Sequence, residues 1–233
     1  MSRSPLVDRL RASSPQISVG VLTADWLNLG SQLQLIESAG VELLHFDVMD
    51  GVFCPQLTLG APVVAGLKTR LLKDVHLMIE DPLPKLESFV AAGADIVTVH
   101  AESTRHIHRA LQALGKMTNA NDPDRGIARG IALNPGTPLG VIEPLLGEFE
   151  MVLLLAVNPG WGGQKFSAAT CERVKQVRER VGDGALICVD GGITRDNISN
   201  VAQLGADIIV TGSAVFDGKA PFDNARHMMS ALR

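Results

Sequence analysis

The stretch that decides the fold runs from residue 185 to residue 212 and reads ALICVDGGITRDNISNVAQLGADIIVTG. Its two apolar, β-branched runs, residues 185–190 and 207–212, have the length and composition of buried strands. Between them, residues 194–203 have the pattern of a helix, and Gly205 follows where that helix would end in a left-handed conformation. The stretch therefore predicts strand, helix and strand in succession, the unit from which parallel sheets are built.

The same alternation extends over the rest of the chain. Apolar runs predict strands at residues 17–22, 42–48, 74–79, 95–100, 130–133, 151–157, 185–190 and 207–212. Helical patterns lie between them at residues 28–39, 84–92, 104–115, 168–180 and 194–203. Nearly continuous apolar strands that alternate with helices indicate an α/β fold in which helices cover a parallel sheet. Eight repeats predict a single (β/α)8 TIM barrel.

An open, doubly wound sheet is the competing architecture, because it would give the same alternation. No GxGxxG motif follows the first predicted strand, however. The polar residues that interrupt the strands are also spread over several strand ends, as expected for a barrel that gathers its active site at one mouth.

The length of the chain is consistent with one barrel. Its 233 residues, 46% of them hydrophobic, are close to the roughly 250 residues typical of this fold. We therefore expect one domain over residues 1–233, with residues 1–15 as an N-terminal extension. The arginines and serines of that extension resemble a transit peptide, but Asp8 interrupts them, and a helix that closes the bottom of the barrel is favoured. Residues 118–126 predict a surface loop.

Charge and cysteine content exclude several classes of function. There are 21 basic and 25 acidic residues, and no run of Lys or Arg forms a stripe for nucleic acid or an anionic membrane. Cys54, Cys171 and Cys188 are far apart and form no CxxC pair, so neither a disulfide framework nor a cysteine zinc site is indicated. No apolar run reaches the roughly 18 to 20 residues of a membrane span. A cytoplasmic protein that binds a small neutral or anionic metabolite is expected.

Polar residues interrupt the predicted strands near the ends that form the mouth of a barrel. Residues 44–51 read LHFDVMDG, and His45 and Asp47 share a face because alternate side chains of a strand do. Two further strands contribute His76 and Asp190. These four side chains offer nitrogen and oxygen donors suited to one divalent cation, Zn²⁺, Fe²⁺ or Mn²⁺. An ionised aspartate in an apolar strand is costly unless it is paired or binds metal, which favours a metal site.

Histidines in strands also have a plainer interpretation. A lone buried histidine is more often a hydrogen-bonded core residue than a ligand. His100, which closes the strand at residues 95–100, is as compatible with a supporting or structural role as with direct contact.

Glycine-rich loops follow the last three predicted strands and would be neighbours in a barrel. Glycines free backbone N–H groups to approach an anion, and barrels commonly bind phosphate at such loops. Tight turns between strand and helix are the alternative explanation. The candidate phosphate-binding residues are Gly160, Trp161, Gly162, Gly163, Gln164, Gly191, Gly192, Gly212 and Ser213.

Six motifs carry a resemblance to the ribulose-phosphate 3-epimerase family. They are DVMDG at 47–51, HLM at 76–78, LNPGTP at 133–138, VNPGWGGQ at 157–164, VDGGI at 189–193 and TGSAVF at 211–216. The similarity extends from about residue 17 to residue 217 and implies a barrel of the ribulose-phosphate-binding type.

The resemblance also implies a mechanism. One divalent metal would be held by His45, Asp47, His76 and Asp190, and the two aspartates would act as acid and base on opposite faces of a bound ketose phosphate. Epimerisation at C3 of D-ribulose 5-phosphate to D-xylulose 5-phosphate is the expected reaction, through an enediolate. A homo-oligomer is expected. Other residues expected to line the site, some of them as core filler, are Met49, Met78, Leu155 and Gly20.

Three positions depart from the family pattern and leave the substrate open. Gly20 replaces a serine, Leu155 replaces a methionine, and Gln56 replaces an asparagine. A 3-epimerase of another ketose phosphate, such as D-allulose 6-phosphate, is therefore an alternative, and so is a non-catalytic barrel that binds sugar phosphates. A decarboxylase or aldolase would require an acidic, lysine-bearing third strand, where this chain offers His76.

Overall fold

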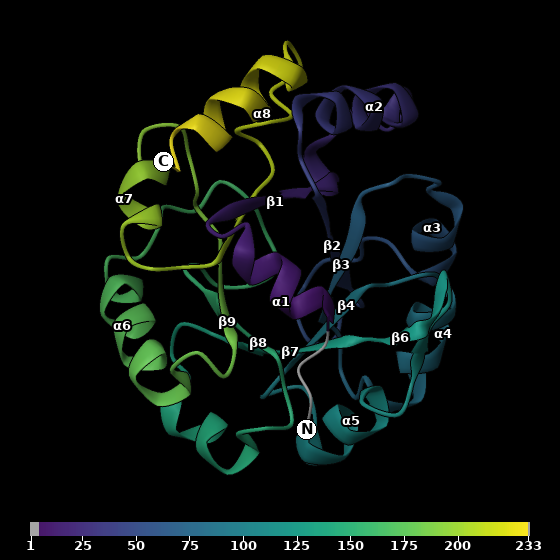
Figure 1. Ribbon diagram of the computed structural model, residues 1–233, viewed down its shortest axis with the longest axis vertical. Coiled ribbons are helices and arrows are strands. Elements are labelled where there is room, and N and C mark those ends of the chain that lie inside the picture. The colour runs from purple at the N-terminus through teal and green to yellow at the C-terminus, as the bar shows by residue number, and fades with distance from the viewer. Residues whose placement is uncertain (1–4, 233) are drawn as a thin grey trace.

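The computed structural model describes residues 5–232. Within this range, eight parallel strands form a closed barrel whose order around the ring is β1, β10, β9, β8, β7, β4, β3 and β2 (Figure 1). The barrel strands are β1 Gln16–Gly20, β2 Leu43–Met49, β3 Leu72–Met78, β4 Ile96–His100, β7 Ala128–Leu133, β8 Met151–Leu155, β9 Leu186–Asp190 and β10 Ile208–Thr211. The predicted TIM barrel is confirmed, and the doubly wound sheet is excluded.

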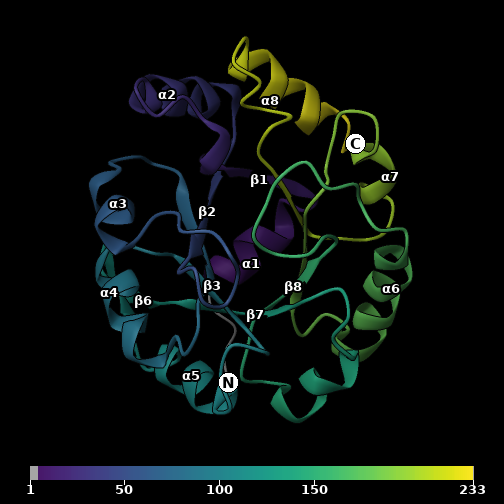
Figure 2. The ribbon, with the colours of Figure 1, turned by 180° about the vertical axis from the view of Figure 1, so that it is seen from behind.

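Helices surround the barrel when it is viewed from either end (Figure 2). The α-helices are α1 Pro5–Ala12, α2 Leu29–Ala39, α3 Ala61–Gly66, α4 Leu86–Ala91, α5 Ile107–Leu114, α6 Ala169–Val181, α7 Ile198–Ala202 and α8 Pro221–Ser230. Short 3-10 helices are η1 Val21–Thr23, η2 Leu83–Lys85 and η3 Leu139–Leu145. Helix α3 was not predicted, because residues 61–66 are too few to show a helical period.

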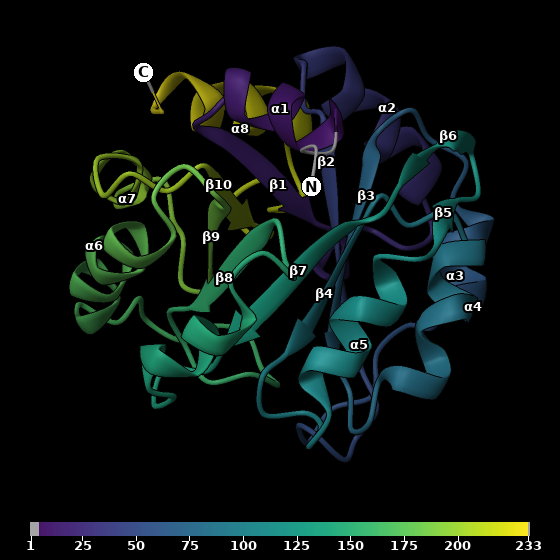
Figure 3. The ribbon, with the colours of Figure 1, turned by 60° about the horizontal axis from the view of Figure 1, so that its bottom comes forward.

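Helix α1 lies across the amino-terminal end of the strands (Figure 3). Its apolar side chains Leu6, Val7 and Leu10 are buried against the first residues of several strands, among them Leu43 and Ile96. The helix predicted to close the bottom of the barrel is therefore present. Residues 1–4 of the predicted extension lie outside the described residues.

The barrel wall separates the two larger apolar clusters of the protein. A large cluster fills the space between the outer faces of the strands and the helices, and includes Val48, Val75 and Val189. A smaller cluster fills the barrel interior at the end covered by α1. At the opposite end lies a small apolar cluster of Met49, Cys54 and Met78, which leaves room beside it for polar side chains.

The loop predicted at residues 118–126 is an antiparallel pair of short strands, β5 Thr118–Asn119 and β6 Asp122–Gly126. Asn119 is buried and donates hydrogen bonds to the carbonyl oxygen of Ala94 and to Asp95. The segment lies largely at the surface, as predicted, but it forms two paired strands in place of an irregular loop, and Asn119 fixes it to residues 94–95. Among the described residues, none of the helices has both the length and the apolar character of a membrane span.

Candidate active site

The carboxyl ends of three strands bring four polar side chains together. His45 and Asp47 lie on β2, His76 on β3 and Asp190 on β9. Residues 45 and 47 point to the same face because they alternate along the strand, and Asp47 is directly beside His76 in the register of β2 and β3. One donor atom from each residue lies within 4.8 Å of the others.

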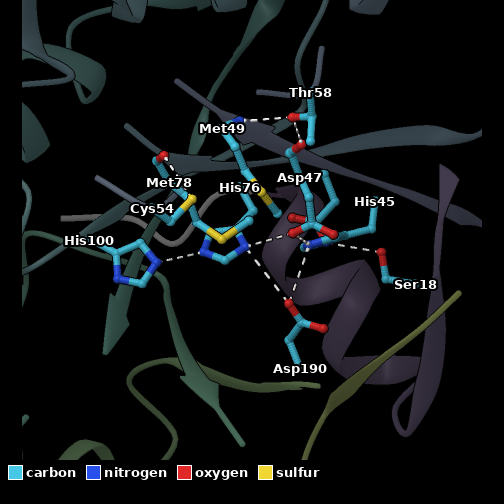
Figure 4. Close-up of polar contacts among 11 residues, drawn as sticks. Ser18, His45, Asp47, Met49, Cys54, Thr58, His76, Met78, His100 and Asp190 are labelled. Atoms are coloured by element: carbon cyan, nitrogen blue, oxygen red, sulfur yellow. Dashed lines mark hydrogen bonds and ion pairs between the residues drawn. The ribbon is translucent and has the colours of Figure 1, made fainter. Parts of the chain in front are cut away.

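The two histidines face the same carboxylate oxygen. Nε2 of His45 and Nδ1 of His76 lie 3.2 and 3.1 Å from Oδ1 of Asp47. Oδ2 of Asp190 lies 3.8 Å from each of the same nitrogens, and its side chain approaches from another strand (Figure 4). Two nitrogen and two oxygen atoms therefore surround one small volume.

Burial and mutual charge shift the ionisation of this group. Burial acts to raise the pKa of Asp47, but His45 and His76 outweigh it and hold that pKa far below its usual range. Burial and the charge of Asp47 together raise the pKa of Asp190 to about 7. Burial acts against the charged ring of His45, but the carboxylates of Asp74 and Asp47 raise its pKa well above the ordinary value. Both raised pKa values favour the protonated forms of His45 and Asp190 in the absence of a cation.

These observations fit a metal site. The side chains of both histidines are unexposed, and those of Asp47 and Asp190 are 19% and 15% exposed, so the oxygens can meet a ligand from the mouth while the nitrogens are shielded. A site of two imidazoles and two carboxylates suits Zn²⁺, Fe²⁺ or Mn²⁺.

Asp74 and Ser18 support His45, and the sequence analysis did not identify either of them. Nδ1 of His45 lies 2.7 Å from Oδ2 of Asp74, which also accepts a hydrogen bond from the Ser18 hydroxyl at 3.0 Å. Asp74 lies two residues before His76 on β3, so the alternation that identified His45 and Asp47 also placed Asp74 inside the barrel.

The residues of β3 also bear on the decarboxylase or aldolase alternative, which would require a lysine and an acid on this strand. This strand does carry a lysine and an acid, Lys73 and Asp74. The ammonium group of Lys73 donates to the carbonyl oxygens of Val64 and Ala92, outside the barrel, while Asp74 is beside His45. Neither side chain lines the cavity at the mouth.

A cavity of about 830 Å³ opens above the four side chains. Asp47 and Asp190 form part of its lining. It is also lined by every glycine-loop residue named from the sequence, namely Gly160, Trp161, Gly162, Gly163, Gln164, Gly191, Gly192, Gly212 and Ser213. The other predicted residues in the lining are Met49, Met78, Leu155, Gly20 and Gln56, and those not predicted include Lys165, Thr194 and Asn197.

The loop after β8 is held in shape by Gln164. Its amide nitrogen donates to the carbonyl oxygens of Asn158 and Trp161, and its amide oxygen accepts from the N–H of Asn158. Gly192, in the next loop, has a φ of +69°, and a Cβ there would lie 2.4 Å from the backbone nitrogen of Phe166. The two loops therefore pack closely enough that only glycine fits at position 192.

Comparison with known proteins identifies the family. A model of the ribulose-phosphate 3-epimerase family matches residues 16–216. The ribulose-phosphate 3-epimerase of Aquifex aeolicus is 40% identical over 221 residues, which cover 93% of this chain and 96% of that protein. The putative epimerase LsrE of Salmonella typhi is 42% identical over 221 residues, which cover 93% of this chain and 87% of that protein.

A solved structure shares the fold at much lower identity. The 3-hexulose-6-phosphate synthase of Salmonella typhimurium has a TM-score of 0.69 at 17% identity and covers 93% of this chain and 98% of its own. The identity is low, so this likeness supports the barrel alone. The match to the family model and the identity to its named members, by contrast, indicate the activity as well as the fold. This chain is therefore a carbohydrate epimerase acting on a ketose phosphate, and it belongs to the ribulose-phosphate 3-epimerase family.

Proposed function

We propose that the chain interconverts D-ribulose 5-phosphate and D-xylulose 5-phosphate at C3, with Asp47 and Asp190 as the acid and base. The observation that carries the proposal is that these carboxylates come from non-adjacent strands, β2 and β9, and border one cavity. A ligand that enters between them meets one carboxylate on each side. That arrangement suits removal of a proton from one face of a carbon by one group and delivery of a different proton to the other face by the second group.

The ionisation of the two aspartates supports this division of work. The pKa of Asp47 is held low and that of Asp190 is raised, and a pair of carboxyl groups with separated pKa values is the usual arrangement of an acid and a base. Which of them is the base depends on the direction of reaction.

A divalent cation is part of the proposal. His45, Asp47, His76 and Asp190 would hold it, and when bound it would polarise the C2 carbonyl and stabilise the negative charge of the enediolate. One carboxylate would take the proton from C3, and the other, in its protonated form, would deliver its own proton to the opposite face of C3. The apolar side chains of Met49 and Met78 would pack against the planar carbon skeleton and exclude water from it.

The phosphate group of the substrate would bind to the loops after β8, β9 and β10. Backbone N–H groups at Gly162, Gly163, Gly192, Gly212 and Ser213 are the candidate donors, since glycines let a phosphate approach the backbone.

A second substrate is favoured by one specific observation. A Cβ at Gly20 would meet only atoms of Gly212, the nearest at 3.5 Å, so the cavity has room there that any larger residue would fill. A longer ketose phosphate such as D-allulose 6-phosphate could use that space. A non-catalytic role is disfavoured because both aspartates are present.

The test is C3 epimerisation assayed over tetrulose, pentulose and hexulose phosphates with the metal-loaded protein. We expect the highest kcat/KM for D-ribulose 5-phosphate. A higher value for a hexulose phosphate would support the second substrate, and no turnover of any ketose phosphate would refute the proposal.

A further inference from the structure

The second ring nitrogen of His76 points away from the cavity toward another histidine. Nε2 of His76 lies 2.9 Å from Nε2 of His100, and the two ring planes are inclined by 27°, with their centroids 5.0 Å apart (Figure 4). Both side chains are unexposed. An imidazole nitrogen either carries a hydrogen or offers a lone pair, so this contact requires one donor and one acceptor.

Glu102 decides which nitrogen of His100 carries the hydrogen. Oε2 of Glu102 lies 3.0 Å from Nδ1 of His100. Its other oxygen, Oε1, accepts hydrogen bonds from the N–H of Asn134 at 2.8 Å and from the hydroxyl of Thr137. These contacts hold the pKa of Glu102 at about 2 against the effect of burial. An ionised carboxylate only accepts, and Nδ1 of His100 must therefore donate.

The protonation of the remaining nitrogens then follows in sequence. A neutral His100 with its hydrogen on Nδ1 has a lone pair on Nε2, so Nε2 of His76 must donate to it. The remaining nitrogen of His76 is Nδ1, which lies 3.1 Å from Oδ1 of Asp47 and is the nitrogen that a cation at this site would take as its ligand. A doubly protonated His100 would reverse this order, but it would place a charged ring in a fully buried position beside Phe53.

We propose that His100 and Glu102 are positioning residues that fix the tautomer and orientation of His76, so that its Nδ1 is available to bind the metal. The proposal rests on the proposed metal site. Neither residue lines the cavity, and each would act only through His76. His45 has a shorter version of the same arrangement, because its Nδ1 faces the carboxylate of Asp74 directly. A second carboxylate thus determines the tautomer of each histidine, and for His76 it does so through an intervening imidazole.

Two substitutions at His100 separate this role from simple packing. His100→Phe keeps an aromatic ring beside Phe53 and His76 but removes the acceptor. His100→Gln keeps an amide oxygen that can accept from His76 and an amide N–H that can donate to Glu102. We expect His100→Phe to weaken Zn²⁺ binding about 10- to 100-fold. His100→Gln should lose clearly less of the affinity for Zn²⁺. Competition with a chromophoric chelator measures both affinities.

The control is another histidine paired with a glutamate. His108 lies on α5 with Nε2 3.4 Å from Oε1 of Glu148, and its side chain is 54% exposed. His108→Phe should leave the affinity for Zn²⁺ unchanged. Thermal unfolding of each metal-free variant shows whether it is folded.

A measurement on the unmodified protein keeps the proposal testable if His100→Phe does not fold. In Zn²⁺-loaded protein labelled with ¹⁵N-histidine, His76 should carry its hydrogen on Nε2 and His100 on Nδ1. Wild-type affinity in His100→Phe, equal losses in both His100 variants, or the opposite tautomer of His76 would each overturn the proposal. Absence of Zn²⁺ binding by the wild-type protein would instead refute the metal site, and the positioning role with it.

Discussion

Nδ1 of His45 lies 2.7 Å from Oδ2 of Asp74, and neither side chain is exposed to solvent. A buried carboxylate is costly unless it is paired, and Asp74 is paired through Oδ2, which also accepts a hydrogen bond from Ser18. The contact orients the imidazole so that Nε2 faces the cavity, and the negative charge makes that nitrogen a stronger metal ligand.

The first prediction concerns this contact. Asp74→Asn should weaken Zn²⁺ binding about 10- to 100-fold, because a neutral amide no longer increases the basicity of His45. Chelator competition measures the loss. Asp95→Asn is the matched control, since Asp95 is also a buried aspartate but pairs with Arg125, near the start of β4. Equal affinities in the wild type and Asp74→Asn would show that Asp74 only fills space.

The second prediction concerns the loop after β9. Gly192→Ala should raise KM for a phosphorylated substrate strongly, because the new Cβ would lie 2.4 Å from the backbone nitrogen of Phe166 and force the two loops apart. Gly30→Ala adds the same methyl group where nothing lies within 4 Å, and KM should not change. A normal KM in Gly192→Ala would argue against phosphate binding by this loop.

The sequence predicted the barrel and the central cluster because both depend on local periodicity. A strand alternates its faces at every second residue, so His45 and Asp47 could be assigned to one face without any structure. The motifs then identified the family. The resemblance to that family implied that His76 and Asp190 join His45 and Asp47 at one metal site.

The supporting residues could not be assigned in the same way. Glu102 follows β4 in what the sequence presents only as a loop, and its contact with Thr137 joins residues 35 positions apart. The pair of short strands at residues 118–126 likewise depends on the burial of Asn119 against Ala94. Such contacts are set by packing between segments, to which local patterns are insensitive. Asp74 is the exception, because its place two residues before His76 was a usable signal.

The third prediction is that metal affinity rises with pH. The pKa of Asp190 is raised to about 7 and that of His45 is raised well above its usual value, so the metal-free site holds protons at neutral pH that a cation must displace. Each displaced proton changes the apparent Kd about tenfold per pH unit. Below the pKa of Asp190 both groups are protonated, so the affinity should fall most steeply there.

Calorimetric titration with Zn²⁺ in buffers of different ionisation enthalpy counts the protons released. We expect more protons to be released at about pH 6 than at about pH 8, because Asp190 loses its proton between these values. An apparent Kd independent of pH over this interval would show that the ligands are already deprotonated in the metal-free protein.

The last prediction separates the two aspartates. Asp47→Asn and Asp190→Asn should each lower the rate of epimerisation by at least about 10²-fold to 10⁴-fold, the usual contribution of a general acid or base. The remaining carboxylate borders the same cavity, and can still remove the C3 proton from its own side and return it there. One variant should therefore exchange the C3 proton with solvent deuterium without inverting C3.

Each aspartate is also a proposed ligand, so the metal content of each sample must be measured, and comparison is valid only between equally loaded proteins. Near wild-type epimerisation by either metal-loaded variant would refute the two-aspartate mechanism, whereas loss of both exchange and epimerisation with metal retained would mean that proton removal needs both carboxylates at once.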